Sequence, residues 1–160
     1  MNMSEPQQSM LSHWTKLSMR DGKLPSRADM RLQDIGRYAS KIVIVDIKDD
    51  PMDYEYRLIG QDVADELDRD YTGSLVSSVP GKGPGSTFWD HVTQIRTEAR
   101  PNYWTEICGI VKAGEKEAGI LYLPLASDHQ TPDKIMLVMH FGRHTERSFV
   151  TADDERYHHA

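Results

Sequence analysis

The alternation of apolar and polar positions along the chain predicts five strands in two groups. Residues 42–47 form a β-branched run interrupted only by Asp46, which is typical of a largely buried strand. Residues 54–60 alternate, which predicts Tyr54, Tyr56 and Leu58 on one face and Glu55, Arg57 and Ile59 on the other. The polar segment 48–53 would join the two runs as a hairpin. Three further runs, separated by polar turns, predict an antiparallel meander: 103–112, 119–126 and 135–141.

The clearest helical pattern lies between these two groups of strands. Ser86 is a favoured N-cap residue, and Phe88, Val92 and Ile95 follow it at helical spacing. The order is therefore two strands, a helical crossing and three strands. It predicts an α+β fold, a five-stranded antiparallel sheet with helices packed on one face.

A second apolar stripe predicts a short leading helix before the sheet. Leu11, Trp14 and Leu17 fall on one side of that helix, and Gly22 would end it. A helix this short has little stability alone, so the stripe must pack on this sheet or on a second subunit. The same three residues are therefore the candidates for a homodimer interface.

These patterns divide the 160-residue chain into four segments around one domain. Residues 1–8 are expected to be disordered, and residues 9–40 to form an N-terminal helical extension. Residues 41–143 would make the folded core, and residues 144–160 a polar tail.

Composition limits the partners and the location. The chain is 38% hydrophobic and 28% charged, which is ordinary for a globular domain. Its net charge of -6 disfavours nucleic acid, because phosphate binding usually requires a basic face. A single cysteine, Cys108, excludes an intrachain disulfide. We find neither a signal peptide nor an apolar run near the roughly 20 residues of a membrane span, so we expect a cytoplasmic protein.

One residue and three short sequences resemble the corresponding features of a family of short alphaproteobacterial PAS proteins. They are Trp14 in the leading helix, Pro-Ser-Arg at 25–27, Tyr-Arg-Leu-Ile-Gly at 56–60 and Tyr-Thr-Gly at 71–73. The resemblance extends over nearly the whole chain. It implies a PAS-like core behind an N-terminal helical extension.

This sequence departs from that family at two places. Gln61 stands where the family often has Thr or Ser, and the Gly- and Pro-rich loop at 80–85 is unusual. That loop also resembles a phosphate-binding Walker loop, but no Gly-Lys-Ser/Thr opens a helix after a strand. Ligand identity therefore does not carry over from the family.

The resemblance implies a sensor or adaptor in bacterial signal transduction. A cup of sheet and helices would hold an unknown small ligand or a signalling protein, and change conformation or oligomeric state. Haem-binding relatives place an iron ligand on the helix that carries His91, but His91 lies at the edge of its apolar stripe. Flavin-binding relatives use an Asn-Cys-Arg motif that this sequence lacks. No cofactor is therefore expected.

Six residues are candidates for contacts with a ligand in the cup. Arg57 would either pair with an acid such as Glu106 or hold a ligand carboxylate or phosphate. The aromatic candidates would serve equally well as core. The full set is Tyr56, Arg57, Trp89, Tyr103, Glu106 and Tyr122.

Two other functions stay open. The first is a small α+β-cone enzyme, an isomerase or hydrolase, with Asp46, His91 or Glu106 as acid and base. It requires those groups to converge in one pocket, which their spacing does not demand, so no catalytic residue is assigned. The second is a structural interaction module with a filled core. Two adjacent histidines at 158–159 do not converge on one ion, so no metal site is assigned either.

Overall fold

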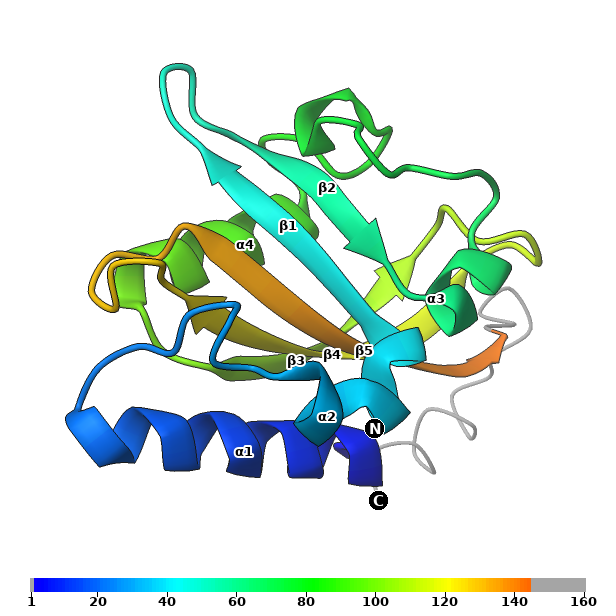
Figure 1. Ribbon diagram of the computed structural model, residues 1–160. Coiled ribbons are helices and arrows are strands. Elements are labelled where there is room, and N and C mark those ends of the chain that lie inside the picture. Colours follow the sequence, from blue (N-terminus) through cyan, green and yellow to red (C-terminus); the bar gives the residue numbers. More distant parts are fainter. Residues whose placement is uncertain (1, 145–160) are drawn as a thin grey trace.

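The computed structural model describes residues 2–144 and has one five-stranded antiparallel sheet at its centre (Figure 1). The strands lie in the order β2-β1-β5-β4-β3. Their bounds are β1 Ile42–Lys48, β2 Asp53–Ile59, β3 Asn102–Cys108, β4 Lys116–Leu125 and β5 Lys134–His144. The predicted fold class is confirmed, and each predicted strand is present.

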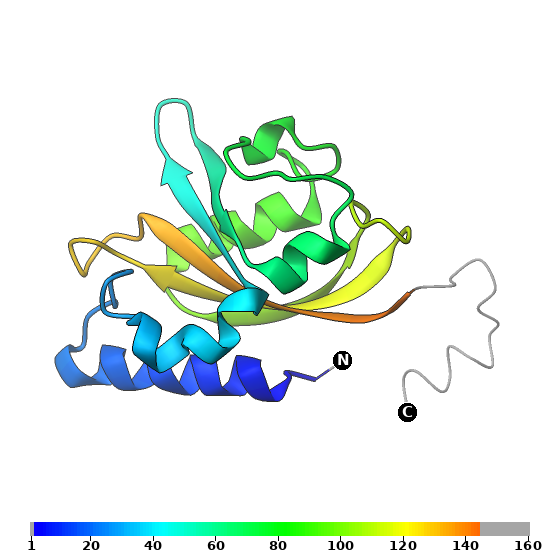
Figure 2. The ribbon, with the colours of Figure 1, turned by 45° about the vertical axis from the view of Figure 1, so that its right-hand side comes forward.

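Helices cover both faces of this sheet (Figure 2). We call inner the face under α3 (Gln61–Glu66), the short 3-10 helix η2 (Val76–Ser78) and α4 (Thr87–Glu98). The outer face carries α1 (Glu5–Asp21), α2 (Leu32–Ile35) and the 3-10 helix η1 (Gly36–Lys41). The leading helix is thus one layer of the domain.

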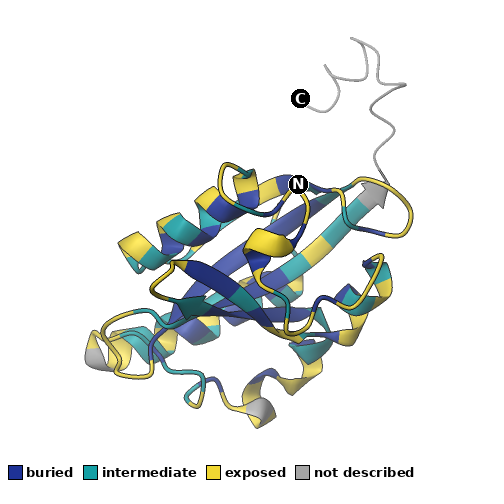
Figure 3. Ribbon diagram, turned by 90° about the horizontal axis from the view of Figure 1, so that it is seen from above, coloured by how far each residue is buried: buried dark blue, intermediate teal, exposed yellow. Residues whose placement is uncertain are grey.

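Successive strand residues feed two separate hydrophobic cores. Ile120 and Leu137 belong to the inner core, whereas their neighbours Leu121 and Val138 belong to the outer core. This division follows from the pleat, which turns successive side chains to opposite faces. The central strands are consequently buried on both sides (Figure 3).

Helix α1 begins earlier than the sequence pattern predicted. Ser4 and Gln7 form a capping box, in which each side chain contacts the other residue's backbone N–H. The Gln7 side chain is fully buried and donates to the carbonyl oxygens of Gly119 and Val138, at 2.9 and 2.8 Å. The predicted disorder of the first eight residues is therefore wrong from Glu5 onward.

The apolar stripe of α1 packs on the sheet of its own chain. Trp14 is buried, and its indole Nε1–H donates to the Pro124 carbonyl oxygen at 2.9 Å. Leu11 and Leu17 are partly buried against the same outer core. The structure thus uses the first of the two packing alternatives, and Trp14 is not accessible to a second subunit.

Strand β2 contains a bulge that reverses its alternation. The register against β1 shifts so that Arg57 is the extra residue and Leu58 pairs with Ile44, a member of the outer core. Ile59 then returns to the inner face, where Tyr56 also lies. The prediction that Leu58 shares a face with Tyr56, and Ile59 with Arg57, is wrong because a bulge cannot be read from period-2 alternation.

Gly60 joins β2 to α3 at a point of very close packing. A Cβ atom at this position would lie 2.5 Å from the carbonyl oxygens of Ala39 and Ser40. The Gly60 N–H also donates to the Ile42 carbonyl oxygen at 2.7 Å. The last residue of the Tyr-Arg-Leu-Ile-Gly sequence is therefore glycine for lack of space.

Candidate functional site

A small apolar cavity lies between the inner face of the sheet and the helices above it. Val43, Ile120 and Leu137 line it from the strands, Val63 from α3 and Phe88 from α4. Its volume is about 30 Å³, which is enough for about one or two water molecules. Side chains therefore nearly fill the cup in this conformation.

One ammonium group faces this otherwise apolar lining. Lys82, in the loop between η2 and α4, is only 7% exposed. Its Nζ lies 5.1 Å from the centre of the Phe88 ring, a cation–π contact. Within residues 2–144, no acid or hydrogen-bond acceptor contacts this Nζ. Buried charges are normally paired, because loss of hydration is costly.

The Tyr56 hydroxyl is a second polar group in the cavity lining without a partner in the described chain. Its ring stacks against Phe88, with centroids 6.4 Å apart and planes inclined by 11°. Burial is the main reason that the pKa of Tyr56 is raised well above its usual value, and nearby Cys108 contributes in the same direction. Phe88 thus contacts two residues, Lys82 and Tyr56, whose polar groups have no hydrogen-bond partner in the described chain.

A hydrogen-bonded cluster around Glu106 lies beside the cavity. Its carboxylate oxygen Oε2 accepts from the Tyr122 hydroxyl at 2.8 Å and lies 2.7 Å from His91 Nδ1. The His91 ring stacks on Trp104 with a centroid distance of 3.9 Å. Burial first, and then the Glu106 charge, raise the pKa of Tyr122 well above its usual value. The cluster connects α4 to strands β3 and β4.

Arg57 lies on the outer face and does not reach Glu106. Its guanidinium contacts the Asp46 carboxylate at 2.6 Å, and Lys134 Nζ approaches the other Asp46 oxygen at 2.7 Å. Burial opposes ionisation of Asp46, but hydrogen bonds from Lys134 and Arg57 bring the net pKa below its usual value. Of the two alternatives for Arg57, the structure shows the pair with an acid, but Glu106 is not that acid: Arg57 follows Tyr56 and so lies on the outer face, whereas Glu106 lies on the inner face. The expected ion pair forms with Asp46.

The remaining predicted candidates lie in different places. Trp89 packs edge-on against Tyr54 in the inner core, with centroids 5.0 Å apart, and is not part of the cavity lining. Tyr103 is packed against the outer core. The inner face therefore gathers four of the six candidates, and of these Tyr56 alone lines the cavity.

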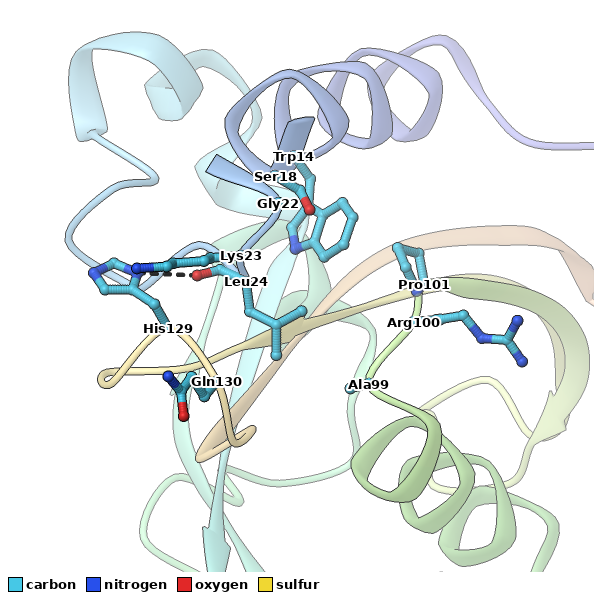
Figure 4. A pocket seen from close by; sticks show the side chains of 10 residues that line it. All are labelled: Trp14, Ser18, Gly22, Lys23, Leu24, Ala99, Arg100, Pro101, His129 and Gln130. Carbon is cyan, nitrogen blue, oxygen red and sulfur yellow. Dashed lines mark hydrogen bonds between the residues drawn. The ribbon is translucent and has the colours of Figure 1, made fainter. Parts of the chain in front are cut away.

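A wider groove lies on the other side of the molecule (Figure 4). It measures about 750 Å³ and is open to solvent between the end of α1, the β4–β5 turn and the link from α4 to β3. Trp14 and Leu24 border it, and His129 Nδ1 contacts the Leu24 carbonyl oxygen at 3.0 Å. Arg100 is exposed, pairs with Glu98 and points away from Trp14 in Figure 4. The groove contributes no buried polar group that lacks a partner.

Lys82 is the site residue that the sequence did not reveal. The sequence shows residues 80–85 as an unusual Gly- and Pro-rich loop that lacks the full Walker pattern. A lysine between two apolar residues that become buried, Val79 and Phe88, was the available signal. It is weak, because burial of a loop residue depends on contacts distant in sequence.

Two further observations concern ions and membranes. Among residues 2–144, no three His, Cys, Asp or Glu side chains are grouped to hold a metal ion. The histidine pair at 158–159 lies outside the described residues. In the described part of the chain, no helix has the length and apolar character needed to cross a membrane.

Comparison with known proteins adds no identification: no family model, no curated protein and no solved structure matches this chain.

Proposed function

We propose that this protein is a cytoplasmic PAS-type sensor or adaptor domain that binds a small molecule in the cavity of its inner face. The observation that carries the proposal is Lys82, a lysine only 7% exposed that lines an apolar cavity and whose Nζ contacts no acid within residues 2–144. A pocket with apolar walls and a few convergent polar groups is the usual form of a small-molecule site. Binding would then alter contacts with a signalling protein.

The arrangement of elements supports this class of protein. Two strands, a helical crossing and three strands match the PAS fold that the Tyr-Arg-Leu-Ile-Gly and Tyr-Thr-Gly sequences resemble. Gly60, the last residue of the first sequence, occupies a position where no larger residue fits. The fold alone does not define a function, so the proposal rests on the cavity and its lining.

Native mass spectrometry of freshly purified protein tests this proposal. We expect a bound mass that is lost on denaturation, because the cavity as it stands leaves its cation unneutralised. A Val63→Phe variant, which places a ring in the cavity, should lose this mass, whereas Val138→Ile on the outer face should retain it. Circular dichroism would verify that both variants fold. The proposal fails if the native protein carries no bound mass and no compound in a ligand screen forms a complex with it.

An acid–base enzyme is the second candidate, favoured by the 2.7 Å contact between His91 and Glu106. Such a pair is typical of a general base oriented by a carboxylate. Neither residue lines the cavity or the groove, and Trp104 covers one face of the imidazole. A His91→Phe variant keeps an aromatic ring at that position. Retention of the bound mass in this variant would support the binding domain, and hydrolysis or isomerisation lost only in the variant would support the enzyme.

A homodimer through α1 is part of the same proposal. Since Trp14 is buried within its own chain, the contact would use the exposed parts of Leu11 and Leu17. Light scattering coupled to size exclusion should give a dimer mass for the native protein and a monomer mass for a Leu11→Ser, Leu17→Ser variant. An unchanged dimer would exclude these residues as the interface.

A further inference from the structure

We propose that the ligand of the inner cavity is an amphipathic monoanion, a carboxylic acid with an apolar chain. Its carboxylate would bind Lys82 Nζ, and its apolar part would enter among the inner-face side chains. This inference rests on the proposed function and specifies the chemistry of the molecule bound.

The charge of the ligand follows from the isolation of Lys82. Lys82 is 7% exposed, yet within residues 2–144 its Nζ contacts the face of Phe88, which carries no net charge, and no acid. A buried ammonium group is most stable when an anion accepts its hydrogen bonds. Because the described lining contains a single cation, the best complement is a single negative charge.

The Tyr56 hydroxyl supplies a second donor for the same group. Tyr56 and Lys82 both contact the Phe88 ring, and neither has a hydrogen-bond partner in the described chain. Among described residues, the fully buried polar side-chain atom without a partner is His13 Nε2, so Lys82 Nζ and the Tyr56 hydroxyl both keep some contact with solvent. A carboxylate on Lys82 Nζ would thus have a second hydrogen-bond donor, the Tyr56 hydroxyl, in the lining of the same cavity.

The shape of the ligand follows from the rest of the lining. Apart from the lysine and tyrosine groups, the walls are aliphatic and aromatic side chains with the Cys108 thiol, which excludes sugars and polyanions. The cavity of about 30 Å³ holds no chain without rearrangement. Gly81 and Gly85, with φ of 78° and 94°, lie in the same loop as Lys82 and have left-handed backbone conformations that favour glycine. A slender alkyl chain requires the smallest displacement.

Isothermal titration with octanoate and 1-octanol tests the inference, because the two probes share a chain and differ in charge. We expect the native protein to bind octanoate more tightly than 1-octanol. Lys82→Met, which approximately preserves the length of the side chain, should weaken the binding of octanoate at least about tenfold and leave the affinity for 1-octanol unchanged. Lys16→Met, at an exposed position on α1, is the matched control and should bind both probes as the native protein does.

Retained 1-octanol affinity in Lys82→Met would show that the variant is folded and its cavity intact. Equal octanoate affinity in the native and Lys82→Met proteins would overturn the inference. It would also be overturned if carboxylates from butanoate to dodecanoate failed to bind while the purified protein carried another small molecule. In that case the proposed function would stand. If the purified protein carries no bound mass and no probe binds, both the inference and the proposed function fail.

Discussion

The helix on the outer face and the cavity on the inner face of the sheet differ in how their polar groups are satisfied. On the outer face, Gln7 and Trp14 each donate to carbonyl oxygens of the strands, so the helix is fixed by satisfied hydrogen bonds. On the inner face, Lys82 and the Tyr56 hydroxyl remain without partners in the described chain. Satisfied groups stabilise a fold, whereas unsatisfied ones reduce stability and are found where a ligand completes them. His13 Nε2 on α1 is also buried without a partner, and nothing in the structure explains it.

The largest effect is expected from removing the outer anchor. Trp14→Ala should lower the free energy of unfolding by about 3–5 kcal/mol, because it creates a cavity and leaves the Pro124 carbonyl oxygen without its donor. Met19→Ala, on the same helix but 77% exposed, should change it by less than about 0.5 kcal/mol. Urea denaturation measures both. A loss below about 1 kcal/mol for Trp14→Ala would show that α1 is not a layer of the domain.

A smaller loss of stability is expected when the hydrogen-bonded cluster around Glu106 is broken. Glu106→Ala leaves the Tyr122 hydroxyl and His91 Nδ1 without their shared acceptor, which should cost about 2–3 kcal/mol. Denaturation at pH 7 measures this loss. No change in stability would mean that the cluster is not formed in solution.

Two tyrosines of the inner face should respond differently to loss of their hydroxyl groups. Tyr122→Phe removes the hydrogen bond to Glu106 and should cost about 1 kcal/mol at pH 7. Tyr56→Phe breaks no protein hydrogen bond, so its unfolding free energy should stay within about 0.5 kcal/mol of the native value. Equal losses in urea denaturation would contradict the assignment of Tyr56 as unpartnered.

Tyr56 also predicts how stability depends on pH in the alkaline range. Burial raises the pKa of Tyr56 in the folded state, so the folded chain keeps its phenolic proton more tightly than the unfolded chain. The contribution of the Tyr56 proton to the free energy of unfolding is complete below about pH 10, the pKa of tyrosine in the unfolded chain, and is lost as the pH rises above that value. Denaturation midpoints between pH 9 and 11 should therefore fall less steeply for Tyr56→Phe than for the native protein. An identical slope would indicate that Tyr56 is solvated.

An effect of opposite sign is expected at Lys82. Lys82→Met removes a charge from a largely buried side chain that no acid contacts in the described chain, so the ligand-free protein should become more stable by up to about 1 kcal/mol. Lys16→Met should leave stability unchanged. Thermal denaturation after removal of bound ligand measures both variants. Destabilisation by Lys82→Met would imply an anionic partner for this lysine within the chain.

Periodic, local features of the fold were predictable, and features that depend on distant contacts were not. Alternation located all five strands, and Ser86 correctly predicted the start of α4, where its side chain accepts from the Trp89 N–H. The bulge at Arg57 depends on the partner strand, so the faces of Leu58 and Ile59 could not be obtained from spacing. The burial of Lys82 depends likewise on how its loop meets Phe88. The capping box of Ser4 and Gln7 was local and could have been recognised.

Methyl NMR of the native protein titrated with octanoate tests the central claim most directly, because neighbouring strand residues report on opposite faces. Ile120 and Leu137 line the inner cavity, whereas Leu121 and Val138 point into the outer core. We predict shifts of the Ile120 and Leu137 methyl signals that saturate with ligand, and much smaller shifts at Leu121 and Val138. Saturating shifts confined to Leu121 and Val138, or none at any of the four, would contradict the account.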